Sequence, residues 1–136
     1  MDRVGIQNEN TNKRIEQNGD ERSVTIPIVT ITLYDNMKFE IYEKCVMDKI
    51  INVSGPPSHV IWDLSNLTSA PMKYIIPQVR LMKRLKSKIW DRIVKSTIIV
   101  NDSNGGNAIR RFLDLIFTFY KPQRPIEIIK KCEYKD

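Results

Sequence analysis

Apolar and polar residues alternate along SVTIPIVTITLY, from Ser23 to Tyr34. A period of two residues is typical of a half-buried β-strand. Asp35 and Asn36 interrupt the alternation, and MKFEIYE (37–43) then resumes it. Two alternating runs on either side of a two-residue turn predict an antiparallel β-hairpin.

Three later segments place apolar residues at helical spacing. The first covers about residues 43–53 and is followed by Gly-Pro-Pro, a sequence that ends helices. The second is a long amphipathic segment over residues 71–94, and the third covers residues 108–120. Short apolar runs that predict strands follow each of them, namely HVIWDL (59–64), STIIV (96–100) and PIEIIKKC (125–132).

The predicted order of elements is therefore β-β-α-β-α-β-α-β. Strands that alternate with helices form right-handed crossovers and a parallel sheet. We predict an α/β fold with a single, mostly parallel sheet, helices packed on it, and the antiparallel hairpin at its edge. Residues 23–136 make up this domain. Residues 1–22 are polar nearly throughout, and we expect them to form a flexible N-terminal tail.

Composition argues against several kinds of site. The two cysteines, Cys45 and Cys132, lie far apart, and His59 is the only histidine. This pattern indicates neither a disulfide framework nor a metal site, so we expect no metal, no cofactor and no catalytic residue. Without a second carboxylate or a histidine near Asp63, an enzyme is not predicted. Lacking an apolar run of membrane-spanning length and a secretory signal, the chain is expected to be cytoplasmic.

The stretch VIWDLSNLTSAP (60–71) is followed by an amphipathic helix, the strand STIIV, a loop, an apolar helix and a last strand. This order resembles the STAS domain, the anti-sigma-factor-antagonist or SpoIIAA-like superfamily, over about residues 28–130. The resemblance implies a regulatory module that binds a protein partner through the loop after the strand. That loop often carries a regulatory Ser or Thr in an Asp-Ser-Ser-Gly-like motif, where this chain has Thr-Ser-Ala-Pro (68–71).

The corresponding loop contains the candidate switch residues Ser69, Thr68 and Ser65. A phosphate there would lie at a helix N-terminus, which favours an anion. The alternative is that a hydroxyl caps the helix that begins near Pro71. Asp63 could likewise be a ligand or could form an Asx-type turn. The expected partner-binding loop consists of Asp63, Asn66 and Met72.

The net charge of the chain is +6, and basic residues recur along the long amphipathic segment. We expect Arg80, Arg84, Lys88, Arg92 and Lys95 to form a basic surface. Such a surface attracts nucleic acid or an anionic membrane. The alternative interpretation is that these residues only form the solvated face of a helix. No aromatic residues alternate with these charges, which weakens the case for nucleic acid.

Three functions therefore remain open. The first is a non-catalytic STAS-like interaction module, either as a monomer or as a homodimer. The second is a small-ligand or lipid-binding member of the same superfamily, with a cavity between the helix over 108–120 and the sheet. The third is binding of nucleic acid or another anionic partner by the basic surface.

Overall fold

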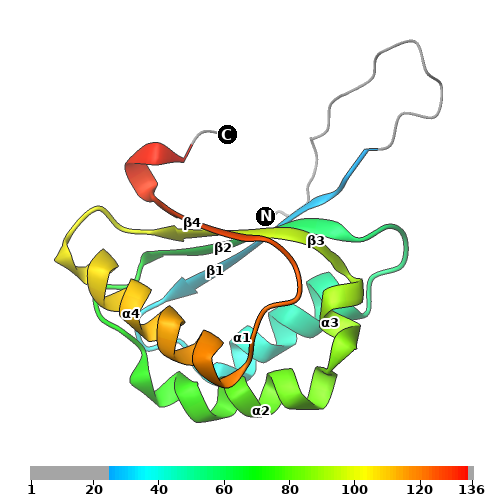
Figure 1. Cartoon of the computed structure of the whole chain (residues 1–136), viewed down its shortest axis with the longest axis horizontal. Helices are drawn as coiled ribbons and strands as arrows, with labels where there is room; N and C mark the ends of the chain where they lie inside the picture. Colours follow the sequence, from blue (N-terminus) through cyan, green and yellow to red (C-terminus); the bar gives the residue numbers. More distant parts are fainter. Residues whose placement is uncertain (1–24, 135–136) are drawn as a thin grey trace.

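The computed structural model describes residues 25–134, so the tail predicted for residues 1–22 lies outside the described residues. A four-stranded sheet and the helices of its crossovers make up this part of the chain (Figure 1). The strands are β1 (Ile28–Tyr34), β2 (Ser58–Asn66), β3 (Ile93–Val100) and β4 (Ile126–Lys130). The helices are α1 (Phe39–Val46), α2 (Ile75–Leu85), α3 (Ser87–Asp91) and α4 (Asn104–Phe119), with a π-helical turn η1 (Met47–Ile51) and two 3-10 turns, η2 (Met72–Tyr74) and η3 (Lys131–Glu133).

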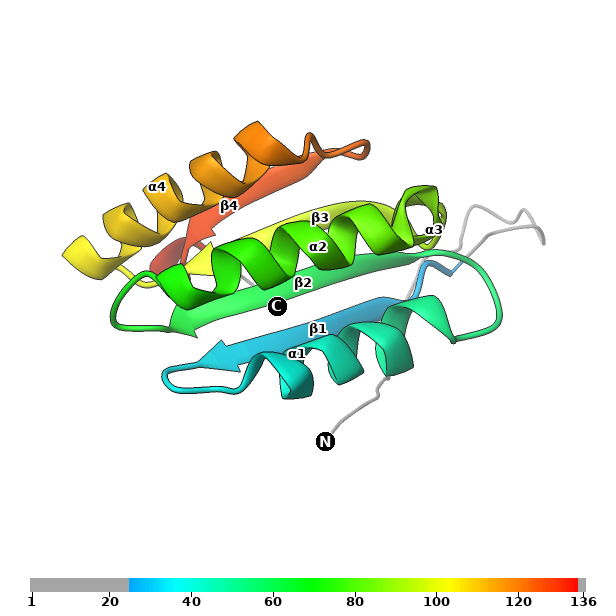
Figure 2. The same ribbon diagram turned by 90° about the horizontal axis from the view of Figure 1, so that it is seen from below.

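The strands lie in the order β1-β2-β3-β4, and each neighbouring pair is parallel. The α/β class predicted from the sequence is confirmed. Because sequential strands are joined by crossovers of one hand, every crossover helix falls on the same face of the sheet. Figure 1 shows α1 to α4 on one side, and Figure 2, viewed from that side, shows α1 beside β1, α2 near β2 and β3, and α4 beside β4.

The predicted edge hairpin is wrong. The turn is present, since the Met37 N–H donates to the Tyr34 carbonyl at 3.2 Å and Asn36 has a φ of 65°. The chain that follows, however, forms α1 instead of a strand. Its buried residues, Tyr42 and Val46, lie four apart, and Ile41, which a strand would have buried, is 46% exposed. A short alternating run fits either period, and here the helix provides the crossover from β1 to β2.

The single helix predicted over 71–94 is also wrong. Residue Lys86, with φ 53° and ψ −133°, ends α2 and begins α3, and β3 starts at Ile93. Neither glycine nor proline marks the break at Lys86, so the apolar spacing alone suggested one continuous helix. The break divides the basic residues of this segment among two helices, a helix end and a strand.

Alternate residues of the strands face the helices and build one core. The strand register places Ile31 beside Trp62 and Trp62 beside Ile98, so these three form a row across the sheet. Ile31 and Ile98 are buried in this core together with residues of α2 and α4. STIIV (96–100), predicted to be covered on both faces, is buried along its whole length in the interior strand β3.

The strand residues that alternate with these core residues face the other side of the sheet, and α1 to α4 do not cover that side (Figure 1). Here the register aligns Thr30, Ile61 and Thr97 in one row. In the next row along the strands, His59 is paired with Lys95. Polar and charged residues are thus mixed with isoleucine on this face, in contrast to the apolar helical side.

Candidate functional site

A surface groove lies at the carboxyl ends of β1 and β2. Two segments form its walls, residues 33–40 after β1 and residues 67–74 after β2. Its volume is about 760 Å³, and its lining mixes charged, hydroxyl and apolar side chains. In parallel α/β sheets, ligands bind outside the carboxyl ends of the strands, so the position is the usual one for a binding site.

Two hydrogen-bonded connections hold the second wall in place. The Asp35 carboxylate accepts from the Thr68 N–H at 3.1 Å and from the Thr68 hydroxyl at 2.7 Å. On the other side, the Asn101 amide donates to the Leu67 carbonyl at 2.7 Å. The loop is therefore fixed to β1 through Asp35 and to β3 through Asn101.

Tyr74 connects the far end of this wall to the first. Its hydroxyl donates to the Met37 carbonyl. Its ring packs edge-on against Phe39, with 5.1 Å between centroids, and lies 6.0 Å from the ring of Tyr42. Burial, together with Tyr34 and Glu40, raises the pKa of Tyr74. The hydroxyl group of Tyr74 is thus a hydrogen-bond donor from the second wall to the loop after β1.

Asp63 forms the Asx-type turn that was one of its two predicted roles. The Ser65 N–H donates to Asp63 Oδ1 at 3.0 Å, and the Ser65 hydroxyl donates to the same oxygen at 2.5 Å. The turn coincides with the irregularity in the pairing of β1 and β2, which lies between the pairs Thr32–Asp63 and Tyr34–Asn66. Ser65 and Asp63 are thus occupied with each other.

The helix-capping role predicted for Ser65, Thr68 or Ser69 is wrong. Pro71 precedes η2 and Tyr74 precedes α2, and neither start has a side-chain cap. Ser69 lines the groove and is exposed, and within residues 25–134 its hydroxyl has no hydrogen-bond partner. Its role as a switch stays a prediction.

The remaining residues of the predicted partner-binding loop are exposed. Asn66 ends β2 on the surface, and Met72 is 57% exposed in the wall of the groove. One turn further along, Ile76 is 62% exposed. Met72 in the groove wall and Ile76 in the first turn of α2 are thus two exposed apolar side chains four residues apart, and the exposure of Ile76 was not predicted from the sequence.

The five predicted basic residues do not share one helix face. Arg80 and Arg84 lie on α2, where Arg84 pairs with Glu43, and Lys88 lies on α3. Lys95 belongs to β3 and is paired with His59, away from the helices. Arg92 donates to the carbonyls of Ile50, Gly55 and Pro56 at 3.3, 2.9 and 3.2 Å.

Arg92 thus fixes the turn after η1 to the end of α3. Of the five, Arg80, Lys88 and Lys95 are exposed and form no side-chain hydrogen bond or ion pair within residues 25–134, and Lys95 lies apart from the other two on β3. Binding of an anionic partner to these residues stays a prediction, and fewer exposed basic residues support it than the sequence suggested.

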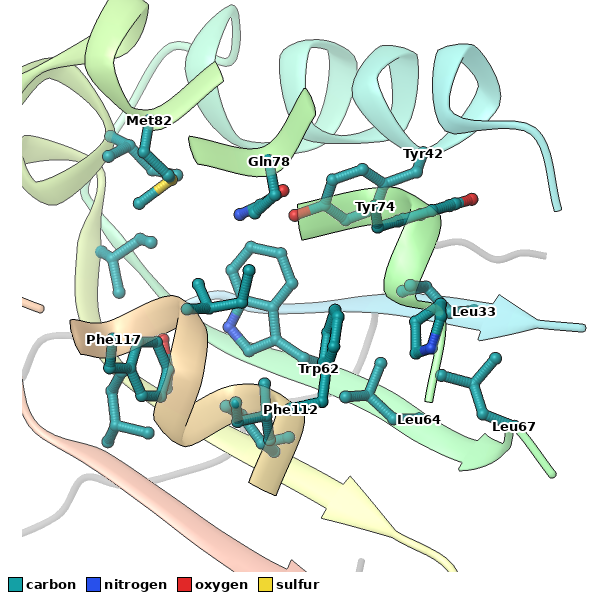
Figure 3. Close-up of a pocket in the computed structure, with 18 of the residues that line it drawn as sticks. Leu33, Tyr42, Trp62, Leu64, Leu67, Tyr74, Gln78, Met82, Phe112 and Phe117 are labelled. Carbon is teal, nitrogen blue, oxygen red and sulfur yellow. The ribbon is translucent and has the colours of Figure 1, made fainter. Parts of the chain in front are cut away.

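A second cavity, of about 100 Å³, lies inside the domain between the sheet and α2 and α4. Figure 3 shows the Trp62 indole among side chains from the helices, with Gln78 on the side of α2 and Phe112 on the side of α4. The lining contains no charged residue. It consists mostly of apolar side chains, among them Leu64, Met82, Ile98, Phe112, Leu113, Ile116 and Phe117.

Two polar atoms at this cavity are buried without a hydrogen-bond partner in residues 25–134, Gln78 Oε1 and Trp90 Nε1. Both residues line the cavity, and Trp90 is only 4% exposed. An unpaired buried polar group costs about 1–3 kcal/mol. Nearby, burial raises the pKa of Tyr42, a shift that the neighbouring Gln78 side chain opposes.

His59 lies on the sheet face opposite the helices, where Nε2 is 2.8 Å from the Thr97 hydroxyl. Sequence analysis had assigned it no partner. Burial lowers the pKa of His59, Lys95 lowers it further, and Glu127 opposes the shift. The register explains this cluster, because it aligns His59 with Lys95 and Thr97 with Glu127.

Asp35, Tyr74, Gln78 and Trp90 are the site residues that sequence reasoning missed. Asp35 was treated as part of a hairpin turn, and the other three as parts of a helix. Their pairings join residues far apart in sequence, such as Asp35 and Thr68, and no local pattern reveals such contacts.

Comparison with protein-family models, curated proteins and solved structures finds no match for the chain. Within residues 25–134, no three His, Cys, Asp or Glu residues lie close enough together to hold a metal ion. No helix of the described part has the length and apolar character needed to cross a membrane.

Proposed function

We propose that this domain is a non-catalytic, STAS-like interaction module that binds a protein partner in the groove between residues 33–40 and 67–74. The observation that carries the proposal is exposed apolar surface at that groove. Met72 lines the groove beside charged and hydroxyl side chains and is 57% exposed, and Ile76, four residues further along, is 62% exposed. Protein interfaces combine exposed apolar side chains with polar ones, and this surface carries both kinds.

The resemblance to the STAS domain supports the same groove. The loop that the resemblance implies for partner binding is the one that forms its second wall. Thr68 and Asn101 anchor this loop at the level of the backbone, so the groove is formed before a partner arrives. A preformed surface loses less conformational entropy on binding.

Ser69 is the switch residue that this geometry favours. The hydroxyl of Thr68 is engaged by Asp35 and that of Ser65 by Asp63, whereas Ser69 is exposed in the groove wall. A phosphate at Ser69 would add nearly two negative charges to the partner surface. It would thereby change affinity through charge, without breaking the hydrogen bonds of the loop.

Affinity capture from native lysate with the tagged full chain tests the proposal. The test variants are Met72→Asp and Ile76→Asp, and the matched control is Phe119→Asp, a residue 58% exposed on α4 away from the groove. We expect a protein that the wild type and Phe119→Asp both retain, and that the Met72 and Ile76 variants lose. Equal retention by all four chains would place the interface elsewhere. Once a partner is identified, Ser69→Asp tests the switch by its effect on the affinity for that partner.

A further inference from the structure

The internal cavity has the features of a ligand site rather than those of a packing defect. Empty cavities in proteins are apolar, and buried polar groups are otherwise hydrogen-bonded. Here an acceptor, Gln78 Oε1, and a donor, Trp90 Nε1, are both left without a partner in the described residues and both belong to the lining. Two unpaired polar atoms at one apolar cavity indicate that a bound molecule supplies the missing partners.

Size and charge define the chemical class of that molecule. An engineered apolar cavity of about 150 Å³ binds benzene. The volume of about 100 Å³ is smaller than that and well below the roughly 300 Å³ of the smallest typical ligand pockets, so the occupant has at most one six-membered ring and no lipid chain fits. Because no charged side chain lines the cavity, a charged ligand would lose its hydration without compensation.

We infer that this cavity binds one small, uncharged, largely apolar molecule that carries a hydroxyl group. The rings of Trp62 and Phe112 and the aliphatic residues of the lining contact its apolar part. A hydroxyl group can pair with either unpaired atom, since its oxygen accepts from an indole N–H and its hydrogen is donated to an amide oxygen. This site is distinct from the partner groove and does not depend on it.

The wall between cavity and groove gives the ligand its route of entry. Leu33, Leu67, Pro71 and Tyr74 line both spaces. All except Leu33 belong to the segment 67–74, which hydrogen bonds to Asp35, Asn101 and Met37 and the buried side chain of Leu67 hold against the fold. Opening the cavity toward the groove requires this segment to move and leaves α2 and α4 folded.

Phenol and toluene provide matched probes, because they have nearly the same shape and differ in the hydroxyl. The chain has two tryptophans, so a ¹⁵N spectrum contains two indole N–H signals, and Trp90→Phe assigns them by the loss of one. We expect phenol to shift the Trp90 indole signal and to bind about tenfold more tightly than toluene, the effect of one buried hydrogen bond. Trp90→Phe should remove that preference while leaving toluene binding within about twofold.

A pair of variants on α4 shows whether the probes occupy this cavity. Leu113→Phe fills it, and Leu115→Phe is the control, because Leu115 is 37% exposed and is not in the lining. We expect Leu113→Phe to abolish binding of both probes and Leu115→Phe to retain it. Unchanged binding in Leu113→Phe, or no shift of either indole signal at millimolar phenol, as when the cavity holds water only, would overturn the inference. If circular dichroism shows that Leu113→Phe does not fold, the test rests on the ratio of phenol affinity to toluene affinity in the wild type and in Trp90→Phe. An equal ratio in the two chains would then overturn the inference.

Discussion

The Thr68 hydroxyl donates a 2.7 Å hydrogen bond to the carboxylate of Asp35, 33 residues earlier in the chain. The same carboxylate accepts from the Thr68 N–H at 3.1 Å. Asp35 follows β1 and Thr68 follows β2, so this contact joins the two loops that form the groove. Together with the Tyr74–Met37 hydrogen bond, this carboxylate holds the two walls of the proposed partner site together.

Substitution of Asp35 by alanine should loosen the groove without unfolding the domain. The change removes the acceptor of both Thr68 donors, and we expect a loss of about 1 kcal/mol in the free energy of unfolding. Hydrogen exchange at the Thr68 amide should accelerate about tenfold, while core amides of β3 exchange as before. Asp114→Ala, an exposed carboxylate on α4, should stay within about 0.5 kcal/mol of the wild type. An unchanged exchange rate at Thr68 would contradict the proposed role of Asp35.

Much of the fold could be predicted from the sequence, because long elements have a clear period. The strands now assigned as β2 and β3 are continuous apolar runs, and α4 has an uninterrupted apolar face. The segment 37–43 was misassigned because seven residues fit a strand and a helix equally well. Because β1 and β2 are parallel, the chain between them has to form a crossover, and this favours the helix. The requirement comes from the pairing of the strands in the sheet and not from the local sequence.

The candidate site could be predicted only in part. The loop after VIWDL was located from its position after a buried strand, and Asp63 has one of its two predicted roles. The capping role failed because the hydroxyl of Thr68 is taken by Asp35, a residue distant in sequence. The cavity could not be predicted at all, since Gln78 and Trp90 lie on different helices and the break at Lys86 sets how those helices meet.

Arg92 should act as a structural residue, in contrast to its exposed neighbours in the predicted basic surface. Its guanidinium donates to three backbone carbonyls, a geometry that the single ammonium of lysine cannot reproduce. Arg92→Lys should therefore lower the free energy of unfolding by about 1–2 kcal/mol in urea, with an unchanged m-value. Arg80→Lys, at an exposed position on α2, should change it by less than about 0.5 kcal/mol. Equal stability of the two variants would assign Arg92 to the solvated surface.

His59 should make the stability of the domain depend on pH. Burial and Lys95 lower its pKa in the folded state, so the unfolded chain binds the proton more readily. The free energy of unfolding should therefore fall as pH drops below about 6.5, the pKa of an unperturbed histidine, and stop falling below the folded-state pKa.

Urea denaturation at several pH values between about 5 and 8 measures this effect. His59→Gln should give a flatter dependence than the wild type, because it removes the titrating group. Lys95→Met should also flatten it, because the folded-state pKa then lies closer to the unfolded value. An unchanged dependence in Lys95→Met would show that the lysine does not act on His59.

Lys86 holds the break between α2 and α3 in a backbone conformation that glycine adopts without strain. Its φ of 53° and ψ of −133° bring its Cβ close to its own backbone, at a cost of about 1–3 kcal/mol for a residue other than glycine. Lys86→Gly should relieve that strain and, after the entropy that glycine adds to the unfolded chain, raise the free energy of unfolding by about 1 kcal/mol. Lys83→Gly, at an exposed position of ordinary helix one turn earlier, should lower it by about 1 kcal/mol instead. Opposite signs for the two glycine substitutions in parallel urea titrations would establish the strain at Lys86, and a loss of stability in both would refute it.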